Sequence, residues 1–276
     1  MSRRIEIAFY MLMAVLFLPL IGLLSPFIWL TRRSSRRRSV KVGLAVSGRW
    51  PDNLQYARFP YDVALFRAGA QVVTVKPSDI DDLRRKIEKL DALLLTGGED
   101  IDPQLYDAPK HLANFINSAR DELEMELLNL AAEMDIPLLA VCRGSQLLAV
   151  KYGGHLVNIE DEDDIHSFRL TNMIKFTGHH VDIVPESRLA KIFPAPELVT
   201  NSIHHQSIAD AGTLNVSARS KDGCIEGVEH PEYDFMIGVQ WHPELRALFE
   251  SANQGLFNAL VEAAAKRKRE QDKGQT

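Results

Sequence analysis

Residues 136–156 read Ile-Pro-Leu-Leu-Ala-Val-Cys-Arg-Gly-Ser-Gln-Leu-Leu-Ala-Val-Lys-Tyr-Gly-Gly-His-Leu and place Cys142 where an apolar run gives way to a helical pattern. This order predicts a strand, a sharp turn and a helix, with Gly144 leaving room for the turn. The following helix would point its N–H groups and positive dipole end at a thiolate and at an oxyanion beside it. Because cysteine is also among the most buried residue types, a packed core residue is the alternative interpretation.

Candidate partners for Cys142 lie far downstream, in residues 236–244 (Met-Ile-Gly-Val-Gln-Trp-His-Pro-Glu). This segment is typical of a strand that ends at His242, with Glu244 two residues further on. A cysteine, a histidine and a carboxylate together can form a thiolate, orient the base and split an amide through a thioester. The two segments therefore indicate nucleophilic catalysis more strongly than either does alone.

Four blocks carry a shared pattern in their order and spacing: 94–106 (Leu-Leu-Thr-Gly-Gly-Glu-Asp-Ile-Asp-Pro-Gln-Leu-Tyr), 141–148 (Val-Cys-Arg-Gly-Ser-Gln-Leu-Leu), 201–208 (Asn-Ser-Ile-His-His-Gln-Ser-Ile) and 238–244 (Gly-Val-Gln-Trp-His-Pro-Glu). Arg120-Asp121 and residues 222–226 fit the same pattern. In these blocks the chain resembles the class I glutamine amidotransferase-like superfamily, and specifically its γ-glutamyl-γ-aminobutyrate hydrolase branch. The resemblance implies a flavodoxin-like α/β fold with a doubly wound, mostly parallel sheet.

The resemblance also implies catalytic roles. Cys142 would be the nucleophile, His242 the general base and acid, and Glu244 the group that orients the imidazole. The backbone N–H groups of Gly98 and Arg143 would form the oxyanion hole. Gly98 follows an apolar run, and the missing Cβ lets backbone approach a ligand, although an ordinary glycine turn is the alternative interpretation.

Three further residues are candidates for substrate binding. Gln146 lies one helical turn beyond Cys142 on the same face, where its amide could bind the amino-acid end of a γ-glutamyl substrate, as in related amidotransferases. An exposed helix glutamine is the alternative. The resemblance places His204 and His205 beside the active site. Adjacent residues on a strand point to opposite faces, so only one of the two would reach the pocket, and spacing does not select it.

Neither a metal, a cofactor nor a nucleic acid is predicted as a ligand. A metal site is the alternative interpretation of His166, His179 and His180, which lie near the acidic run 160–164. No spacing there matches a zinc or calcium loop, so we interpret the acidic run as a solvated loop. The net charge of −5 and the lack of a basic face in the predicted domain argue against nucleic acid.

The first 38 residues predict a membrane anchor. The chain carries no charge from Ile7 to Leu30, and this uncharged stretch is long enough to cross roughly 30 Å of hydrocarbon as a helix. A cleaved signal peptide is the alternative, but the run is long for a signal core and lacks a small-x-small cleavage site. Five arginines follow the run (Arg32, Arg33, Arg36, Arg37 and Arg38), against two before it (Arg3 and Arg4). The positive-inside rule then predicts a single-pass protein with a cytoplasmic catalytic domain.

Strands alternate with helices along the first part of the domain. We expect strands at 40–46, 72–75, 92–95 and 138–141, helices at 61–68, 81–90 and 122–134, later strands at 181–184, 216–218, 225–229 and 235–240, and a last helix at 245–265. Reactive groups should then gather at the carboxyl ends of the parallel strands. The predicted parts are an anchor with its basic segment (1–38), a catalytic domain (39–265) and a basic polar tail (266–276).

The resemblance implies a cysteine-dependent hydrolase of γ-glutamyl amide bonds that releases glutamate and an amine through a thioester. Two alternatives stay open. One is a glutaminase subunit that supplies ammonia to a partner synthase. The other is a catalytically silent, membrane-tethered binding or scaffold protein of the same fold, favoured by two departures from the family pattern: Ala140 replaces a glycine, and residues 158–161 replace a Gln-Asp segment.

Overall fold

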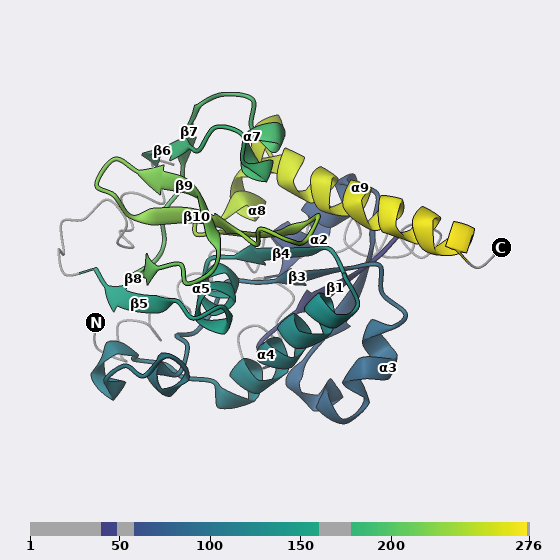
Figure 1. Cartoon of the computed structure of the whole chain (residues 1–276), viewed down its shortest axis with the longest axis horizontal. Helices are drawn as coiled ribbons and strands as arrows, with labels where there is room; N and C mark the ends of the chain where they lie inside the picture. The colour runs from purple at the N-terminus through teal and green to yellow at the C-terminus, as the bar shows by residue number, and fades with distance from the viewer. Residues whose placement is uncertain (1–39, 49–57, 160–177, 275–276) are drawn as a thin grey trace, which may run out of the picture.

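The computed structural model describes residues 40–48, 58–159 and 178–274. The strands in this part of the chain are β1 (Lys41–Ala45), β2 (Gln71–Val75), β3 (Ala92–Leu95), β4 (Leu138–Val141), β5 (His155–Asn158), β6 (His179–Ile183), β7 (Glu197–Thr200), β8 (Gln206–Asp210), β9 (Asn215–Ser220), β10 (Ile225–Glu229) and β11 (Met236–Val239). They form one sheet in the order β2-β1-β3-β4-β11-β10-β9-β6-β7, and β8 links β10 to β5 (Figure 1).

The half of the sheet from β2 to β11 is parallel and covered by helices on both faces. One face packs against α2 (Phe59–Arg67) and α9 (Ser251–Gly274), and the other against α3 (Leu83–Ile87), α4 (Ser118–Glu133) and α5 (Arg143–Lys151). The short helix α7 (Arg188–Ile192) packs on β9 and α9, and α8 (Pro243–Arg246) packs on α2 and α9. Figure 1 shows α9 on one side of the sheet and α4 on the other. This is the predicted doubly wound α/β architecture.

The sequence of β3 explains why both faces are covered. All four of its residues are buried, and neighbours alternate between two cores. Leu94 belongs to the core that contains Phe257 of α9, whereas Leu93 belongs to the core that contains Leu127 of α4. A continuous apolar run is typical of a strand that is buried on both faces in a parallel sheet.

The parallel arrangement brings distant segments to one edge of the sheet. Leu95 at the end of β3 pairs with Ala140, and Val141 at the end of β4 pairs with Val239 at the end of β11. The residues that follow these three strands therefore emerge side by side at their carboxyl ends, which is where sites form in open α/β sheets.

Beyond β11 the sheet continues with antiparallel strands. The strands predicted at 92–95, 138–141 and 225–229 are confirmed to the residue, whereas β5, β7 and β8 were not predicted. The helix predicted at 81–90 is instead a 3-10 turn (Pro77–Asp82) followed by α3; two further 3-10 turns span Pro103–Tyr106 and Lys110–Leu112.

The last helix begins and ends later than predicted. The segment 245–265 covers the end of the short α8, a break, and the first part of α9, which runs on to Gly274. The basic residues of the predicted tail therefore extend a helix. Several of them contact the body of the domain: Lys266 Nζ lies 2.6 Å from Asp234 Oδ2, Arg267 Nη2 donates to Met134 O at 2.8 Å, and Lys268 Nζ lies 3.5 Å from Asp91 Oδ1.

The predicted membrane span, residues 7–30, lies outside the described residues. Within the described ranges, no helix combines the length and the apolar character that crossing a membrane requires.

Candidate active site

Cys142 lies at the turn between β4 and α5. Its backbone has φ 50° and ψ −107°, a conformation that non-glycine residues rarely adopt. Two hydrogen bonds hold the turn: Cys142 N donates to Val239 O at 2.8 Å, and Gln146 N donates to Cys142 O at 3.0 Å. The strained strand-to-helix turn predicted for Cys142 is thus present.

His242 is held by two residues, one at its ring and one at its backbone. Its Nδ1 lies 2.7 Å from Glu244 Oε1, and Asn201 fixes its backbone through bonds of 3.0 Å to both N and O. A methyl group on Gly97 would lie 2.7 Å from His242 Cε1 and 3.5 Å from Cys142 Cβ. The ring and the cysteine therefore flank Gly97 together, and only a residue without a side chain fits between them.

The charge on the imidazole follows from these contacts. Burial by itself would lower the pKa of His242, but the Glu244 carboxylate and the Cys142 sulfur raise it well above its ordinary value of 6.5. The contacts of the ring thus favour its protonated form. A histidine held in this way can act as a general acid or base.

Tyr61 of α2 is a site residue that the sequence did not indicate. Its hydroxyl accepts a hydrogen bond from Gly97 N at 3.3 Å. Burial and the nearby Glu244 carboxylate raise the pKa of Tyr61 well above 10, so the phenol stays neutral. Because the Gly97 N–H is engaged in this bond, the next amide, that of Gly98, is the one left to serve as an oxyanion donor.

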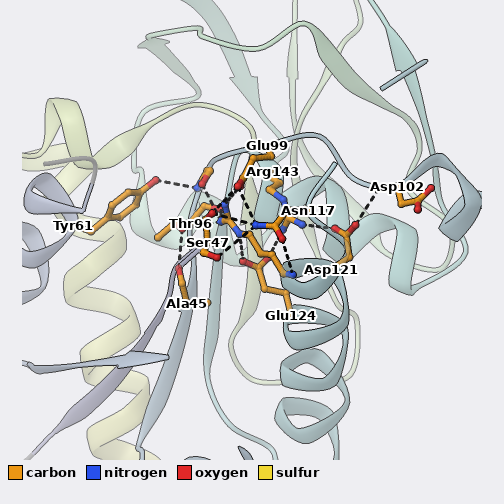
Figure 2. A network of polar contacts seen from close by, with 12 residues as sticks. Ala45, Ser47, Tyr61, Thr96, Glu99, Asp102, Asn117, Asp121, Glu124 and Arg143 are labelled. Atoms are coloured by element: carbon orange, nitrogen blue, oxygen red, sulfur yellow. Dashed lines mark hydrogen bonds and ion pairs between the residues drawn. The ribbon is translucent and has the colours of Figure 1, made fainter. Parts of the chain in front are cut away.

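The two predicted oxyanion donors follow neighbouring strands. Gly98 comes after β3 with a φ of +154°, and Arg143 opens α5. The Arg143 side chain is buried and contacts Glu124 and Asp121 of α4, which the sequence did not indicate (Figure 2). Arg120, also on α4 and fully buried, bonds Glu124 and Glu99, and these side chains together form one polar network.

The carboxylates of this network titrate differently. Burial would raise the pKa of the Glu99 carboxyl, but Arg120 and the Ser47 hydroxyl lower it to about 2. In Asp121 burial prevails over the charge of Arg143 and raises the pKa. Glu99 is thus a permanent anion at neutral pH, which matches its 2.7 Å contact with Arg120 Nη1.

Gln146 lies near Cys142, as predicted, but its amide nitrogen is bound within the protein. Its Nε2 donates to Gln206 O at 3.0 Å and to Gln240 Oε1 at 3.1 Å. Gln240 in turn places its Nε2 3.6 Å from Cys142 Sγ. Gln240 was not predicted, although it lies in the block that also holds His242.

The two adjacent histidines occupy a loop before β8, so the expectation that they lie on a strand is wrong. They nevertheless point in different directions. His204 is buried, with Nδ1 3.0 Å from Gln206 O and Nε2 3.7 Å from Glu226 Oε1. His205 is half exposed, with Nε2 3.1 Å from Asp100 Oδ1. His204 is therefore the inward residue of the pair.

The alternative metal site has no counterpart in the described part of the chain. His166 and the acidic run 160–164 lie outside it. His179 Nε2 lies 2.9 Å from Glu226 Oε1, and His180 Nδ1 lies 2.8 Å from Glu197 Oε1. Among the described residues, no group of three or more His, Cys, Asp or Glu side chains could hold a metal ion.

Comparison with known proteins places this geometry in a family. The model of the peptidase C26 family matches residues 43–244. The glutamine amidotransferase-like protein YvdE of Lactococcus lactis is 32% identical over 217 residues, 77% of this chain and 90% of that protein. The γ-glutamyl-γ-aminobutyrate hydrolase of Escherichia coli O157:H7 is 31% identical over 194 residues, 66% of this chain and 74% of that protein.

The fold is that of the glutamine amidotransferase-like proteins. The glutaminase domain of Trypanosoma brucei CTPS, solved with bound acivicin, superposes with a TM-score of 0.62 at 16% identity, over 83% of this chain and 94% of that chain. The match of the family model covers most of the domain and includes the turn at Cys142, the loop with Gly97 and Gly98, and the segment 236–244. The chain belongs to the peptidase C26 family.

Proposed function

We propose that this protein is a cysteine-dependent hydrolase of γ-glutamyl amide bonds, with Cys142 as nucleophile, His242 as general acid and base, and Glu244 as the residue that orients the ring. The observation that carries the proposal is the position of the three side chains: Cys142 lies on a strained turn, the His242 ring and Cys142 both flank Gly97, and Glu244 lies 2.7 Å from the ring nitrogen Nδ1. This is the arrangement of nucleophile, base and orienting acid that acyl transfer requires.

The reaction proceeds in two halves. The Cys142 thiolate attacks the γ-carbonyl carbon, and the amides of Gly98 and Arg143 bind the resulting oxyanion. His242 protonates the amine as the C–N bond breaks, which leaves a γ-glutamyl thioester. The neutral ring then removes a proton from water, the hydroxide attacks the thioester, and glutamate leaves with the thiolate restored.

Two relatives support different versions of this chemistry. A γ-glutamyl-γ-aminobutyrate hydrolase at 31% identity supports transfer of the γ-glutamyl group to water from a substituted amine. A glutamine amidotransferase-like protein at 32% identity supports the second candidate, a glutaminase that acts on the unsubstituted amide and passes ammonia to a synthase. Both versions use the same thioester, so they differ only in the leaving amine.

A substrate panel separates these candidates. The purified full-length chain is incubated with γ-glutamyl-γ-aminobutyrate, other γ-glutamyl amines, γ-glutamyl dipeptides and glutamine, and glutamate release is measured by chromatography. We expect release from one or more substituted amines at a higher kcat/KM than from glutamine. Release from glutamine alone would favour the glutaminase. No release from any member of the panel would overturn the hydrolase and favour a silent scaffold.

We further propose that residues 7–30 anchor the enzyme in a membrane with the catalytic domain on the cytoplasmic side. The support is the uncharged run itself and the five arginines that follow it. A reporter that is active only in the cytoplasm, fused after Thr276, should be active, and the protein should sediment with membranes. Activity of a reporter specific to the exported side would contradict this orientation.

A further inference from the structure

The loop that carries Gly98 is held from behind by Arg120. Arg120 Nη2 donates to Thr96 O at 2.9 Å and to Gly97 O at 3.0 Å. The guanidinium also packs directly on Gly98, because a Cβ at that position would lie 2.0 Å from Arg120 Nη1. Two consecutive carbonyl groups of the loop and one α-carbon are therefore fixed by a single side chain that is 0% exposed.

This contact determines which way the Gly98 amide points. In a trans peptide the C=O of one residue and the N–H of the next point in opposite directions. Because the Gly97 carbonyl faces Arg120, the Gly98 N–H is directed away from Arg120. The α-carbon of Gly97 lies beside His242 and Cys142. If this peptide turned over, its carbonyl oxygen would take the place of the donor and repel an oxyanion.

The second donor is held by the other arginine. The N–H of Arg143 belongs to the first turn of α5, where amides have no partner within the helix. Its side chain is 1% exposed and reaches α4, with Nη1 on Glu124 Oε2 and Nη2 on Asp121 Oδ1. The position of this amide relative to α4 is thus set by a buried, doubly bonded guanidinium.

A single carboxylate joins the two halves. Glu124 accepts a bond of 2.7 Å from Arg120 Nε on one oxygen and the bond from Arg143 Nη1 on the other, and the residue is 0% exposed (Figure 2). Two guanidinium groups thereby face three carboxylates: Glu99, Asp121 and Glu124. One oxygen of Glu124 therefore binds the arginine that contacts the Gly98 loop, and the other binds the arginine whose own amide is the second donor.

We infer that Arg120 and Glu124 are positioning residues that set the separation and direction of the two oxyanion donors. The inference rests on the proposed acyl-transfer function, and it assigns neither residue a contact with substrate. Their effect should therefore fall on the step in which negative charge develops on oxygen, and it should leave the reactivity of the Cys142 sulfur itself unchanged.

Two reagents, applied to the full-length chain, distinguish stabilisation of an oxyanion from the reactivity of the Cys142 sulfur. With p-nitrophenyl acetate the thiolate attacks the ester carbonyl, passes through a tetrahedral oxyanion and expels p-nitrophenolate, so the rate depends on the hole. Iodoacetamide reacts by displacement of iodide at a saturated carbon and forms no oxyanion. Both rates are measured in a Cys224→Ala background, because the chain contains two cysteines.

The test variant is Arg120→Lys, which keeps the charge but cannot reach Glu124 and the loop carbonyls at once. We expect acylation to slow by about 10- to 100-fold, somewhat less than the loss of one donor costs, with the alkylation rate unchanged. Thr96→Val, which removes the contact to Arg120 Nη2 and the hydrogen bond to Ala45 O but no charge, should give a smaller loss in the same direction. Glu124→Gln should act like Arg120→Lys.

Leu127→Ala is the matched control, because it destabilises the same helix through the apolar core and touches no group of the network. It should leave the ratio of the two rates unchanged. The inference is overturned if acylation and alkylation fall together in Arg120→Lys and Thr96→Val, if neither falls, if Leu127→Ala lowers the ratio equally, or if the native protein is alkylated but not acylated. A chain that shows the expected ratios yet hydrolyses no γ-glutamyl amide would overturn the proposed function alone.

Discussion

Cys142→Ala should lower kcat for γ-glutamyl amide hydrolysis by about 10⁴- to 10⁶-fold, because without the sulfur no thioester forms and only binding and the oxyanion donors remain. The measurement is glutamate release by the full-length protein on its best substrate. The fold should survive the change, since alanine fills part of the same space and the turn keeps its backbone hydrogen bonds to Val239 and Gln146. A thermal unfolding curve checks this.

Cys224→Ala is the control for this prediction. Cys224 is a partly buried cysteine in the turn before β10, outside the group formed by Cys142, His242 and Glu244. Its replacement should leave kcat and KM as they are in the native protein. Turnover by Cys142→Ala comparable to that of the native protein, or loss of activity in Cys224→Ala alone, would exclude Cys142 as the nucleophile.

Glu244→Gln should lower kcat by about 10²- to 10⁴-fold, because the amide neither charges nor orients the imidazole as the carboxylate does. Glu244 raises the pKa of His242, so the variant should have a lower pKa at this ring. The protonated ring is the form that protonates the leaving amine, and activity is lost as pH rises through its pKa. The alkaline limb of the kcat profile should therefore move to lower pH.

The same interaction stabilises the fold over a defined pH range. Because folding raises the pKa of His242, its contribution is fully present below the ordinary value of 6.5 and is lost as pH rises through the raised value.

The control for the pH profile of Glu244→Gln is Glu229→Gln. Glu229 is another buried carboxylate; it accepts a hydrogen bond from Arg188 and lies opposite the start of β11. A Glu244→Gln variant whose alkaline limb coincides with that of Glu229→Gln would show that Glu244 does not set the charge of His242.

The parallel half of the fold was predictable because its signal is local. Residues 92–95 and 138–141 are continuous apolar runs between turn residues, and their strands were placed to the residue. By contrast, β8 has the sequence Gln-Ser-Ile-Ala-Asp, with no alternation that marks a strand. It is a strand because it pairs with β5, and that pairing depends on tertiary contacts.

The site residues likewise divide into those with a local sequence signal and those whose place depends on tertiary contacts. Cys142, His242 and Glu244 were predicted from two short segments, because in each segment the residues next to the reactive side chain form a recognisable pattern. Tyr61 was missed, since nothing near it in sequence indicates that α2 packs beside the loop after β3.

The bridge between the two arginines was missed for a related reason. Arg120 and Glu124 are one helical turn apart, which suggests an ordinary pair on a helix surface. The third member, Arg143, is 19 residues beyond Glu124 in the chain and reaches it only when α5 packs against α4. Contacts of this kind arise from packing, which a pattern read along the chain does not contain.

Cys142 should carry the γ-glutamyl group during turnover, and the mass of the acid-quenched enzyme reveals that adduct. The native protein is mixed with γ-glutamyl-p-nitroanilide, whose good leaving group favours accumulation of the acyl-enzyme, then quenched, weighed intact and mapped by peptide. We expect a mass increase of one γ-glutamyl group on the peptide that contains Cys142, and none in Cys142→Ala. Release of p-nitroaniline with Cys142 unmodified throughout, or with the adduct on another residue, would show that Cys142 is not the nucleophile.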